Sequence, residues 1–318
     1  MLRLLLATAA LLCAASSASA QYPDRPVRII VPYSAGGTSD FVARITAQKL
    51  SELTGKTFYV ENKPGASGRL GYETGTKATP DGYTLVGADT SFAMLPGLYA
   101  KLPWTQDTAL RTITITAQTP VVIAVHPKTG FKTLRDLIVY AKANPGKLNY
   151  GSGGVGSSTH LAGELFKRVA GVDIAHVPYK GAGDAVTGLV SGQVELLITA
   201  PPTVISLVRA GNLTALAVTS VQRSAALPDV PSVVEAGLPG FIVSNWFGLM
   251  APKDTPDAIV DYLQKEVATA MAADTIKERL RAQGAEPVAS APQASAQKVS
   301  DETKLWTDVV HDAGIKVE

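Results

Sequence analysis

Short apolar runs alternate with amphipathic segments along most of the chain. Residues 26–33 are a mostly apolar run that predicts a buried strand, and residues 38–53 repeat apolar positions at helical spacing. The same criteria predict further strands at 57–60, 83–87, 121–125, 148–150, 174–177, 194–199, 213–218 and 241–250, and helices at 67–77, 158–170, 183–191, 203–210 and 257–271. Repeated strand–helix units are typical of an α/β fold with mainly parallel sheets covered by helices on both faces.

Local signals mark the ends of several of these segments. Thr133 and Asp136 have the spacing of a capping box, with Asp in place of Glu or Gln. Thr255 and Pro256 stand directly before the helix at 257–271, and proline is favoured in a first helical turn. Residues 285–296 are rich in Ala, Pro, Ser and Gln, and they predict a loop before the last helix.

The first twenty residues have the order of segments found in a secretory signal peptide. Arg3 supplies a basic start, residues 4–12 are apolar but too short to span a bilayer, and residues 18–20 read Ala-Ser-Ala. We therefore expect cleavage before Gln21 and a periplasmic protein; the alternative is a buried helix. Cys13 follows Leu12 rather than a small residue, so we expect no lipid anchor.

The composition argues against several functional classes. Cys13 is the only cysteine, so the processed chain would have neither disulfides nor thiolate metal sites. The net charge of +2 gives no preference for nucleic acid or anionic membranes. The four histidines show no metal-binding spacing, and we expect no metal and no cofactor.

Two glycine-rich loops are the candidates for ligand contact. The first, SAGGT at 34–38, follows a predicted strand and opens a helix, where unpaired backbone N–H groups can hold an anion. The second, at 151–160, contains Gly-x-Gly-x-x-Gly, but no acidic residue ends the next strand as a dinucleotide site requires. Nicotinamide cofactors are also not expected outside the cytoplasm. This loop is therefore interpreted as a second anion cradle, although a tight turn that serves packing alone is the alternative for the first loop.

Enzyme signatures are missing from the sequence. Residues 54–57 contain Gly-Lys-Thr, but Leu50 stands where a phosphate loop needs glycine, and no Gly-x-Ser-x-Gly occurs. A Ser-His-Asp triad assembled in space stays an alternative, because triads are spatial arrangements. A periplasmic α/β hydrolase is thus the second hypothesis, and a binding protein without enzymatic activity is the first.

Eight segments together resemble the Bug family, the substrate-binding receptors of tripartite tricarboxylate transporters. They occur in the family's order from near Gln21 almost to the end of the chain. They are YSAGGTSD (33–40), ENKPGA (61–66), ATPDGYTL (78–85), STHLAGEL (158–165), VPYKG (177–181), LAVTS (216–220), LPDVPS (227–232) and WFGLMAP (246–252).

The resemblance implies a type II-like periplasmic-binding-protein fold with two α/β lobes that close on a ligand. It implies a first lobe of residues 21–124 plus 222–318 and an inserted second lobe of 125–221. The ligand would be a small carboxylate, and the partner a membrane transporter or a sensor; we expect a monomer. Family likeness places the ligand contacts at Tyr33, Ser34, Ala35, Gly36, Gly37, Thr38, Ser157, Ser158, Thr159, His160, Tyr179, Lys180 and Gly181, with Ser91 and Thr199 as weaker candidates.

Two departures from the family pattern bear on the ligand. Ser34 stands where many members have proline, which predicts a less rigid first loop. Thr199 occupies a position where members often carry an acidic residue that could bind an amino group. Since threonine has no charge, the sequence favours a carboxylate without an amino group.

Overall fold

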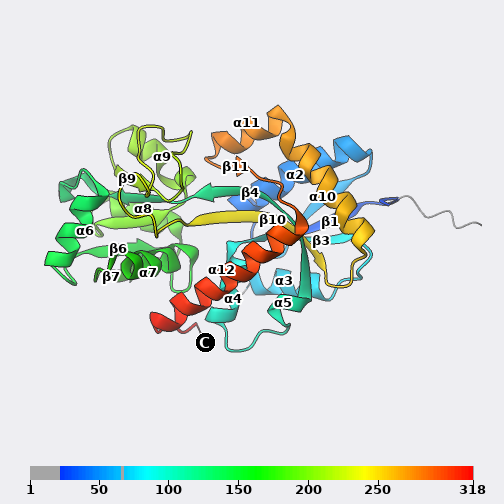
Figure 1. Ribbon diagram of the computed structural model, residues 1–318, viewed down its shortest axis with the longest axis horizontal. Coiled ribbons are helices and arrows are strands. Elements are labelled where there is room, and N and C mark those ends of the chain that lie inside the picture. The colour runs from blue at the N-terminus through cyan, green and yellow to red at the C-terminus, as the bar shows by residue number, and fades with distance from the viewer. Residues whose placement is uncertain (1–21, 66–67, 318) are drawn as a thin grey trace, which may run out of the picture.

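The computed structural model describes residues 22–65 and 68–317, and it forms two α/β lobes (Figure 1). The predicted signal peptide lies outside the described residues. The strands are β1 (Val27–Val31), β2 (Phe58–Asn62), β3 (Thr84–Asp89), β4 (Leu110–Pro120), β5 (Val122–Val125), β6 (Asn149–Ser152), β7 (Ala175–Pro178), β8 (Leu196–Thr199), β9 (Thr214–Val218), β10 (Ser244–Pro252) and β11 (Glu286–Pro287).

Helices cover both faces of both sheets. They are α2 (Thr38–Thr54), α3 (Arg69–Thr76), α4 (Thr90–Leu98), α5 (Gln106–Ala109), α6 (Leu134–Ala143), α7 (Ser158–Ala170), α8 (Ala182–Val190), α9 (Pro201–Arg209), α10 (Asp257–Ala272), α11 (Asp274–Ala282) and α12 (Pro292–Asp312). The two-lobed α/β architecture predicted from the sequence is therefore confirmed.

The first lobe is built on a six-stranded sheet in the order β11-β4-β10-β3-β1-β2. Helices α2, α10 and α11 pack on one face, where Ile45 and Leu263 are buried against β1 residues such as Ile29. Helices α3, α4 and α12 pack on the other face, which buries Tyr72 and Trp306.

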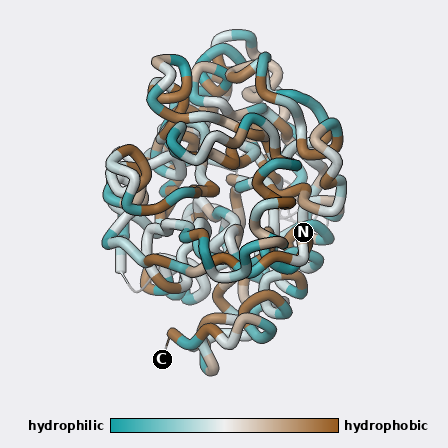
Figure 2. Tube along the Cα trace, turned by 90° about the vertical axis from the view of Figure 1, so that its left-hand side faces the viewer, coloured by the Kyte–Doolittle hydropathy of each residue, from teal (hydrophilic) through white to brown (hydrophobic). Residues whose placement is uncertain are grey.

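The second lobe is built on a five-stranded sheet in the order β7-β6-β8-β5-β9. Helices α8 and α9 cover one face with Leu189 and Val204, and α6 and α7 cover the other with Leu137 and Phe166. The cluster under α6 and α7 continues into that under α4 and α12, so one apolar core spans both lobes. Figure 2 shows apolar and polar stretches alternating along the trace.

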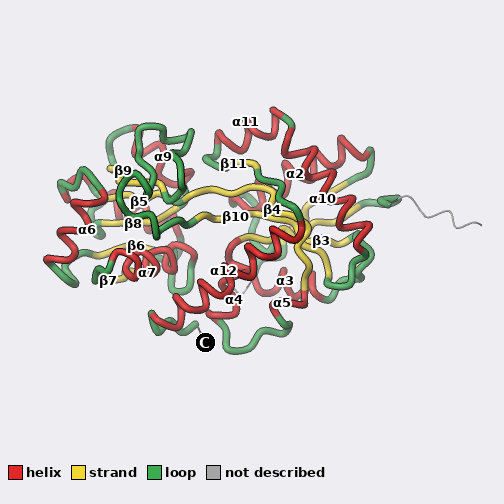
Figure 3. The backbone as a smooth tube through the Cα atoms, viewed as in Figure 1, coloured by secondary structure: helices red, strands yellow, loops and turns green. Residues whose placement is uncertain are grey.

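Two adjacent strands connect the lobes. β4 and β10 pair antiparallel and run side by side from the first lobe toward the second (Figure 3). At the boundary between the lobes, Thr219 is fully buried. Its Oγ1 accepts a hydrogen bond from Val121 N at 2.9 Å and donates one to Val243 O at 2.5 Å. The two connections are thus held together at one point.

The sheets are mixed, which corrects the prediction of mainly parallel strands. β4, β10 and β11 run antiparallel to their neighbours, and β5 is antiparallel to both β8 and β9. The reason is that the chain leaves the first lobe on β4 and returns on β10, in opposite directions. Neither β4 nor α4 was predicted, and the loop expected at 285–296 instead contains β11 and the start of α12.

Candidate functional site

The first-lobe loop, residues 33–38, joins β1 to α2. Ser34, Ala35, Gly36 and Gly37 are all exposed. Gly36 has φ +94°, a conformation that favours glycine, whereas Gly37 has an ordinary φ of −79° and forms the N-cap of α2 without a side-chain cap. No side chain caps the first turn of α2, and no atom lies within 4 Å of a Cβ placed on Gly36 or Gly37, so the first N–H groups of the helix are open to an anion.

The buried carboxylate of Asp89 binds this loop and the start of α2 through hydrogen bonds. Asp89 Oδ1 accepts hydrogen bonds from Tyr33 Oη at 2.9 Å and Ser91 N at 3.0 Å, and Asp89 Oδ2 accepts one from Ser39 Oγ at 2.6 Å. Tyr33 Oη also lies 2.5 Å from Ser91 Oγ. Burial, followed by the charge of Asp89, raises the pKa of Tyr33 well above its usual value, so the phenol stays protonated. The structure thus brings the predicted Tyr33 and Ser91 together around a residue that the sequence analysis missed.

Asp40 fixes the loop from its other side. Its Oδ2 accepts from Gly36 N at 3.0 Å and Arg44 Nε at 2.9 Å, and its Oδ1 accepts from Asn62 Nδ2 at 2.8 Å. Burial opposes ionisation, but the bonds from Arg44, Gly36 and Asn62 outweigh it and lower the pKa of Asp40. Asp40 thus fastens the loop to the first turn of α2, where a negative charge is favoured by the helix dipole.

The Gly/Ser loop, residues 151–157, comprises the end of β6 and the connection to α7 in the second lobe. Ser157 caps α7 by accepting from His160 N at 3.2 Å, and its Oγ donates to Gly154 O at 2.7 Å. Thr159 Oγ1 accepts from Gly153 N at 2.9 Å. The hydroxyls of Ser157 and Thr159 therefore shape the loop itself.

The Tyr179–Gly181 turn packs directly against this loop. Tyr179 N donates to Ser152 O at 2.9 Å, and a Cβ on Gly154 would lie 3.3 Å from Tyr179 O. Tyr179 Oη donates to Gln193 at 3.2 Å, while Lys180 is exposed. The structure thus brings the two predicted second-lobe segments together.

His160 is 5% exposed, and its Nδ1 accepts a hydrogen bond from Gly156 N at 3.0 Å. Its ring stacks on that of His176, with centroids 3.8 Å apart and planes 10° apart. Burial, and then the neighbouring His176, lowers the pKa of His160 to about 4, and burial lowers that of His176 as well. His160 is therefore placed to support the loop from behind, and His176 is a second residue that the sequence analysis missed.

Ser158 and Thr159 line a small cavity at the boundary between the lobes. Its other walls include Asn245 on β10 and Trp306 on α12, whose buried Nε1 has no hydrogen-bond partner within residues 22–65 and 68–317. None of residues 33–38 lines this cavity. Thr199 is 1% exposed, and its Oγ1 lies 3.0 Å from Oγ1 of Thr203.

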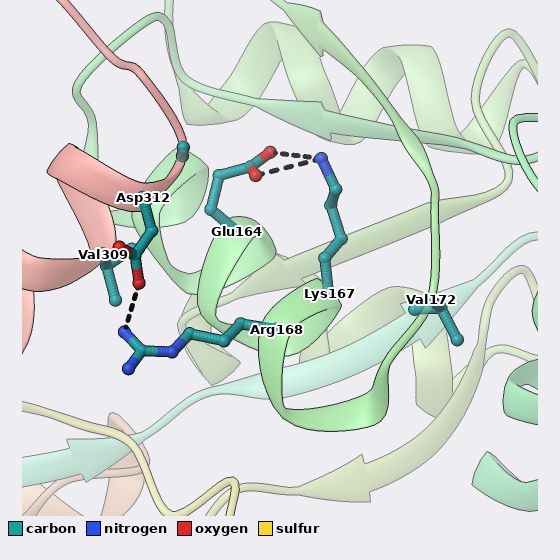
Figure 4. Close-up of a pocket in the computed structure, with 7 residues that line it drawn as sticks. Glu164, Lys167, Arg168, Val172, Val309 and Asp312 are labelled. Atoms are coloured by element: carbon teal, nitrogen blue, oxygen red, sulfur yellow. Dashed lines mark hydrogen bonds and ion pairs between the residues drawn. The ribbon is translucent and has the colours of Figure 1, made fainter.

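A second cavity of about 260 Å³ lies outside the predicted site, between α7 and the end of α12 (Figure 4). Glu164 and Lys167 form an ion pair on its wall at 2.9 Å, and Arg168 pairs with Asp312 at 3.1 Å. The second pair joins the second-lobe helix α7 to α12 of the first lobe.

The described part of the chain has no group of three or more His, Cys, Asp or Glu placed to hold a metal ion. In the same residues, no helix is both long enough and apolar enough to cross a membrane.

Comparison with known proteins identifies the family. The sequence model of one protein family, described as tripartite tricarboxylate transporter family receptor, matches residues 42–315. The chain belongs to this receptor family. Protein BugT of Bordetella pertussis (strain Tohama I) is 36% identical over 299 residues, which cover 93% of this chain and 92% of the relative.

Solved structures of the same family share the fold. An R. palustris protein solved with adipate is 35% identical with a TM-score of 0.80, over 93% of this chain and 100% of that one. MatC from Rhodopseudomonas palustris, solved with malate, is 32% identical with a TM-score of 0.75, over 91% and 100%. The resemblance to the Bug family is confirmed, and membership of a receptor family favours binding over the hydrolase hypothesis.

Proposed function

We propose that this protein is an exported receptor that closes its two lobes on a small carboxylate. The observation that carries the proposal is the start of α2, where the exposed N-cap Gly37 leaves the first backbone donors of the helix without a side-chain cap and residues 33–38 include no Lys or Arg. Uncharged main-chain donors at a helix N-terminus suit a carboxylate. Adipate and malate in the two R. palustris relatives support this ligand class.

The ligand would lie between the first-lobe loop and the facing elements of the second lobe. On the second lobe, the Gly/Ser loop, the start of α7 and the Tyr179–Gly181 turn would complete the enclosure. Closure would bend the two connections between the lobes, a hinge motion of known type. We place the hinge where β4 gives way to β5 and beside Thr219, a few residues from the expected boundaries at 124 and 222.

Export to the periplasm, cleavage before Gln21 and action as a monomer complete the proposal. The family description favours delivery of the ligand to a membrane transporter. Delivery to a sensor uses the same closed state, and loss of carboxylate uptake on deletion of the gene would decide for transport.

A thermal-unfolding screen with adipate, malate and citrate tests the ligand class. A ligand at 100 times its dissociation constant adds about 2.7 kcal/mol of stability. Adipamide, which keeps the length of adipate without its charges, is the matched control and should have no effect. Stabilisation by adipamide but by none of the acids would contradict the proposal, as would consumption of an acid by catalytic amounts of the protein.

A further inference from the structure

Three aromatic rings form a stack behind the Gly/Ser loop. The rings of His160 and His176 face one another at 3.8 Å, and the ring of Tyr150 stacks on His176 at 4.9 Å. His160 comes from the first turn of α7 and His176 from β7, so the stack joins a helix to the edge strand beside it. The stack therefore depends on the packing of α7 against β6 and β7.

Both histidines bond to the loop through ring nitrogens. His160 Nδ1 accepts from Gly156 N at 3.0 Å, which requires an unprotonated Nδ1. His176 Nε2 lies 2.6 Å from Ser152 Oγ, and that same oxygen accepts from Gly154 N at 3.1 Å. Gly154 and Gly156 have φ of +121° and +76°, a region that other residues rarely adopt. Because glycine can adopt many backbone conformations, these bonds help to hold the two glycines in the observed one.

The surrounding charges do not favour a protonated pair. Glu164 on α7 faces both rings, but it already accepts from Tyr150 Oη at 2.6 Å and pairs with Lys167 at 2.9 Å (Figure 4). Lys167 adds a positive charge on the same side. A proton on either imidazole would therefore lack an unpaired anion, and two charged rings at 3.8 Å would repel.

We propose that His160 and His176 are positioning residues of the second-lobe cradle, which hold the Gly/Ser loop in its binding shape only while both rings are uncharged. Acid then releases the loop: a proton on His160 Nδ1 turns an acceptor into a donor that faces the N–H of Gly156. The receptor would bind its ligand at neutral pH and lose affinity as the pair takes up a proton. The consequence for affinity rests on the proposed function, whereas the movement of the loop does not.

A reporter on the loop tests the movement without any ligand. Val155 is 52% exposed, and residues 21–318 contain no cysteine, so Val155→Cys in that processed chain can carry a single environment-sensitive fluorophore. We expect its emission to change as the pH falls from 7.5 to 4, while far-UV circular dichroism shows that the protein stays folded.

The matched variants keep the bonds and remove the titration. In His160→Asn the amide oxygen takes the place of Nδ1, and in His176→Gln the amide takes the place of Nε2. The double variant should show no acid transition of the fluorophore. His126→Asn is the control, because His126 Nδ1 also accepts a backbone N–H, that of Lys128 at 3.0 Å, but outside the loop. An unchanged transition in the double variant would overturn the proposal.

Calorimetric titration with adipate tests the effect on affinity. The carboxyl groups of adipate titrate in every variant, so the histidine contribution is the difference between the natural protein and His160→Asn/His176→Gln. One coupled proton changes affinity by up to about tenfold per pH unit. We expect the natural protein to lose more affinity in acid than the double variant, and equal loss or tighter binding would contradict this. Absence of adipate binding in all forms at pH 7.5 would count against adipate as a ligand, and the fluorophore titration would still decide on the histidines.

Discussion

The hydroxyl of Thr219 accepts a hydrogen bond from the backbone N–H of Val121 at 2.9 Å, and so joins the outgoing and returning connections between the lobes. The backbone takes part as well, since Thr219 N donates to Val121 O at 3.0 Å. Because the same hydroxyl donates to Val243 O, three chain segments meet at one buried side chain. Rotation of one lobe against the other therefore requires these bonds to act as the pivot or to break.

Thr219→Val should destabilise the protein, because it keeps the shape of the side chain and removes the hydroxyl. Val121 N–H would be left buried without a partner, at a cost of about 1–3 kcal/mol. Denaturant unfolding measures this loss, and Thr219→Ser, which keeps the hydroxyl, is the control. Equal stability of the Val and Ser variants would show that the hydroxyl bond contributes nothing.

Gly37→Leu should abolish ligand binding while the fold survives. Gly37 has an ordinary φ of −79°, and no atom lies within 4 Å of a Cβ placed there, so a side chain meets open space. A leucine would cover the first N–H groups of α2, whereas Gly37→Ala should weaken binding less. Adipate titration with a parallel melting curve checks both effects, and unchanged affinity in Gly37→Leu would move the site elsewhere.

Tyr33→Phe should lower the free energy of unfolding by about 1.5–3 kcal/mol, the range for hydrogen bonds to charged groups. The change removes the phenol that donates to Asp89 at 2.9 Å and leaves its ring in place. Tyr59→Phe is the control, since Tyr59 is 45% exposed. A loss no larger than that of Tyr59→Phe would mean that the remaining donors satisfy Asp89 without Tyr33.

Stability should fall in acid because of His160. Its pKa is about 4 in the folded protein and 6.5 as the reference for the unfolded chain, so the unfolded state binds more protons between these values. The stabilisation by the neutral ring is complete above pH 6.5 and is lost as the pH falls toward 4, by about 3 kcal/mol. Chemical unfolding of the natural protein and His160→Asn across this range measures the difference. Parallel stability curves for the two proteins would refute the assignment.

The parts of the fold that the sequence predicted have a strong local signal. α2 was predicted with its start because apolar residues recur at helical spacing after two glycines. β4 was missed because threonines alternate with isoleucines, which lowers its apolar character. In the folded chain Thr114 Oγ1 donates to Ser290 O at 2.7 Å and Thr119 Oγ1 to Gly284 O at 2.8 Å. These carbonyls lie more than 160 positions away, so nothing local shows that the hydroxyls can be buried.

The candidate site likewise contains residues that the sequence predicted and residues that it did not. Its glycine loops could be read from the sequence, because a glycine pair after a strand is a local feature. Asp89 and His176 could not, since their meaning depends on partners from other elements: Ser39 is 50 positions from Asp89, and Ser152 is 24 from His176. A charged residue at the end of a buried strand was the available hint for Asp89.

The place of β10 between β3 and β4 has a consequence for the order of folding. The first-lobe sheet has a gap at its centre until the chain reaches residue 244, whereas the strands of the second lobe all lie between residues 122 and 218. During synthesis or translocation from the N-terminus, the later-starting lobe can be complete first. Until β10 is added, the sheet β3-β1-β2 presents one edge of β3 without its partner, and chaperones and proteases can meet the exported chain in this state.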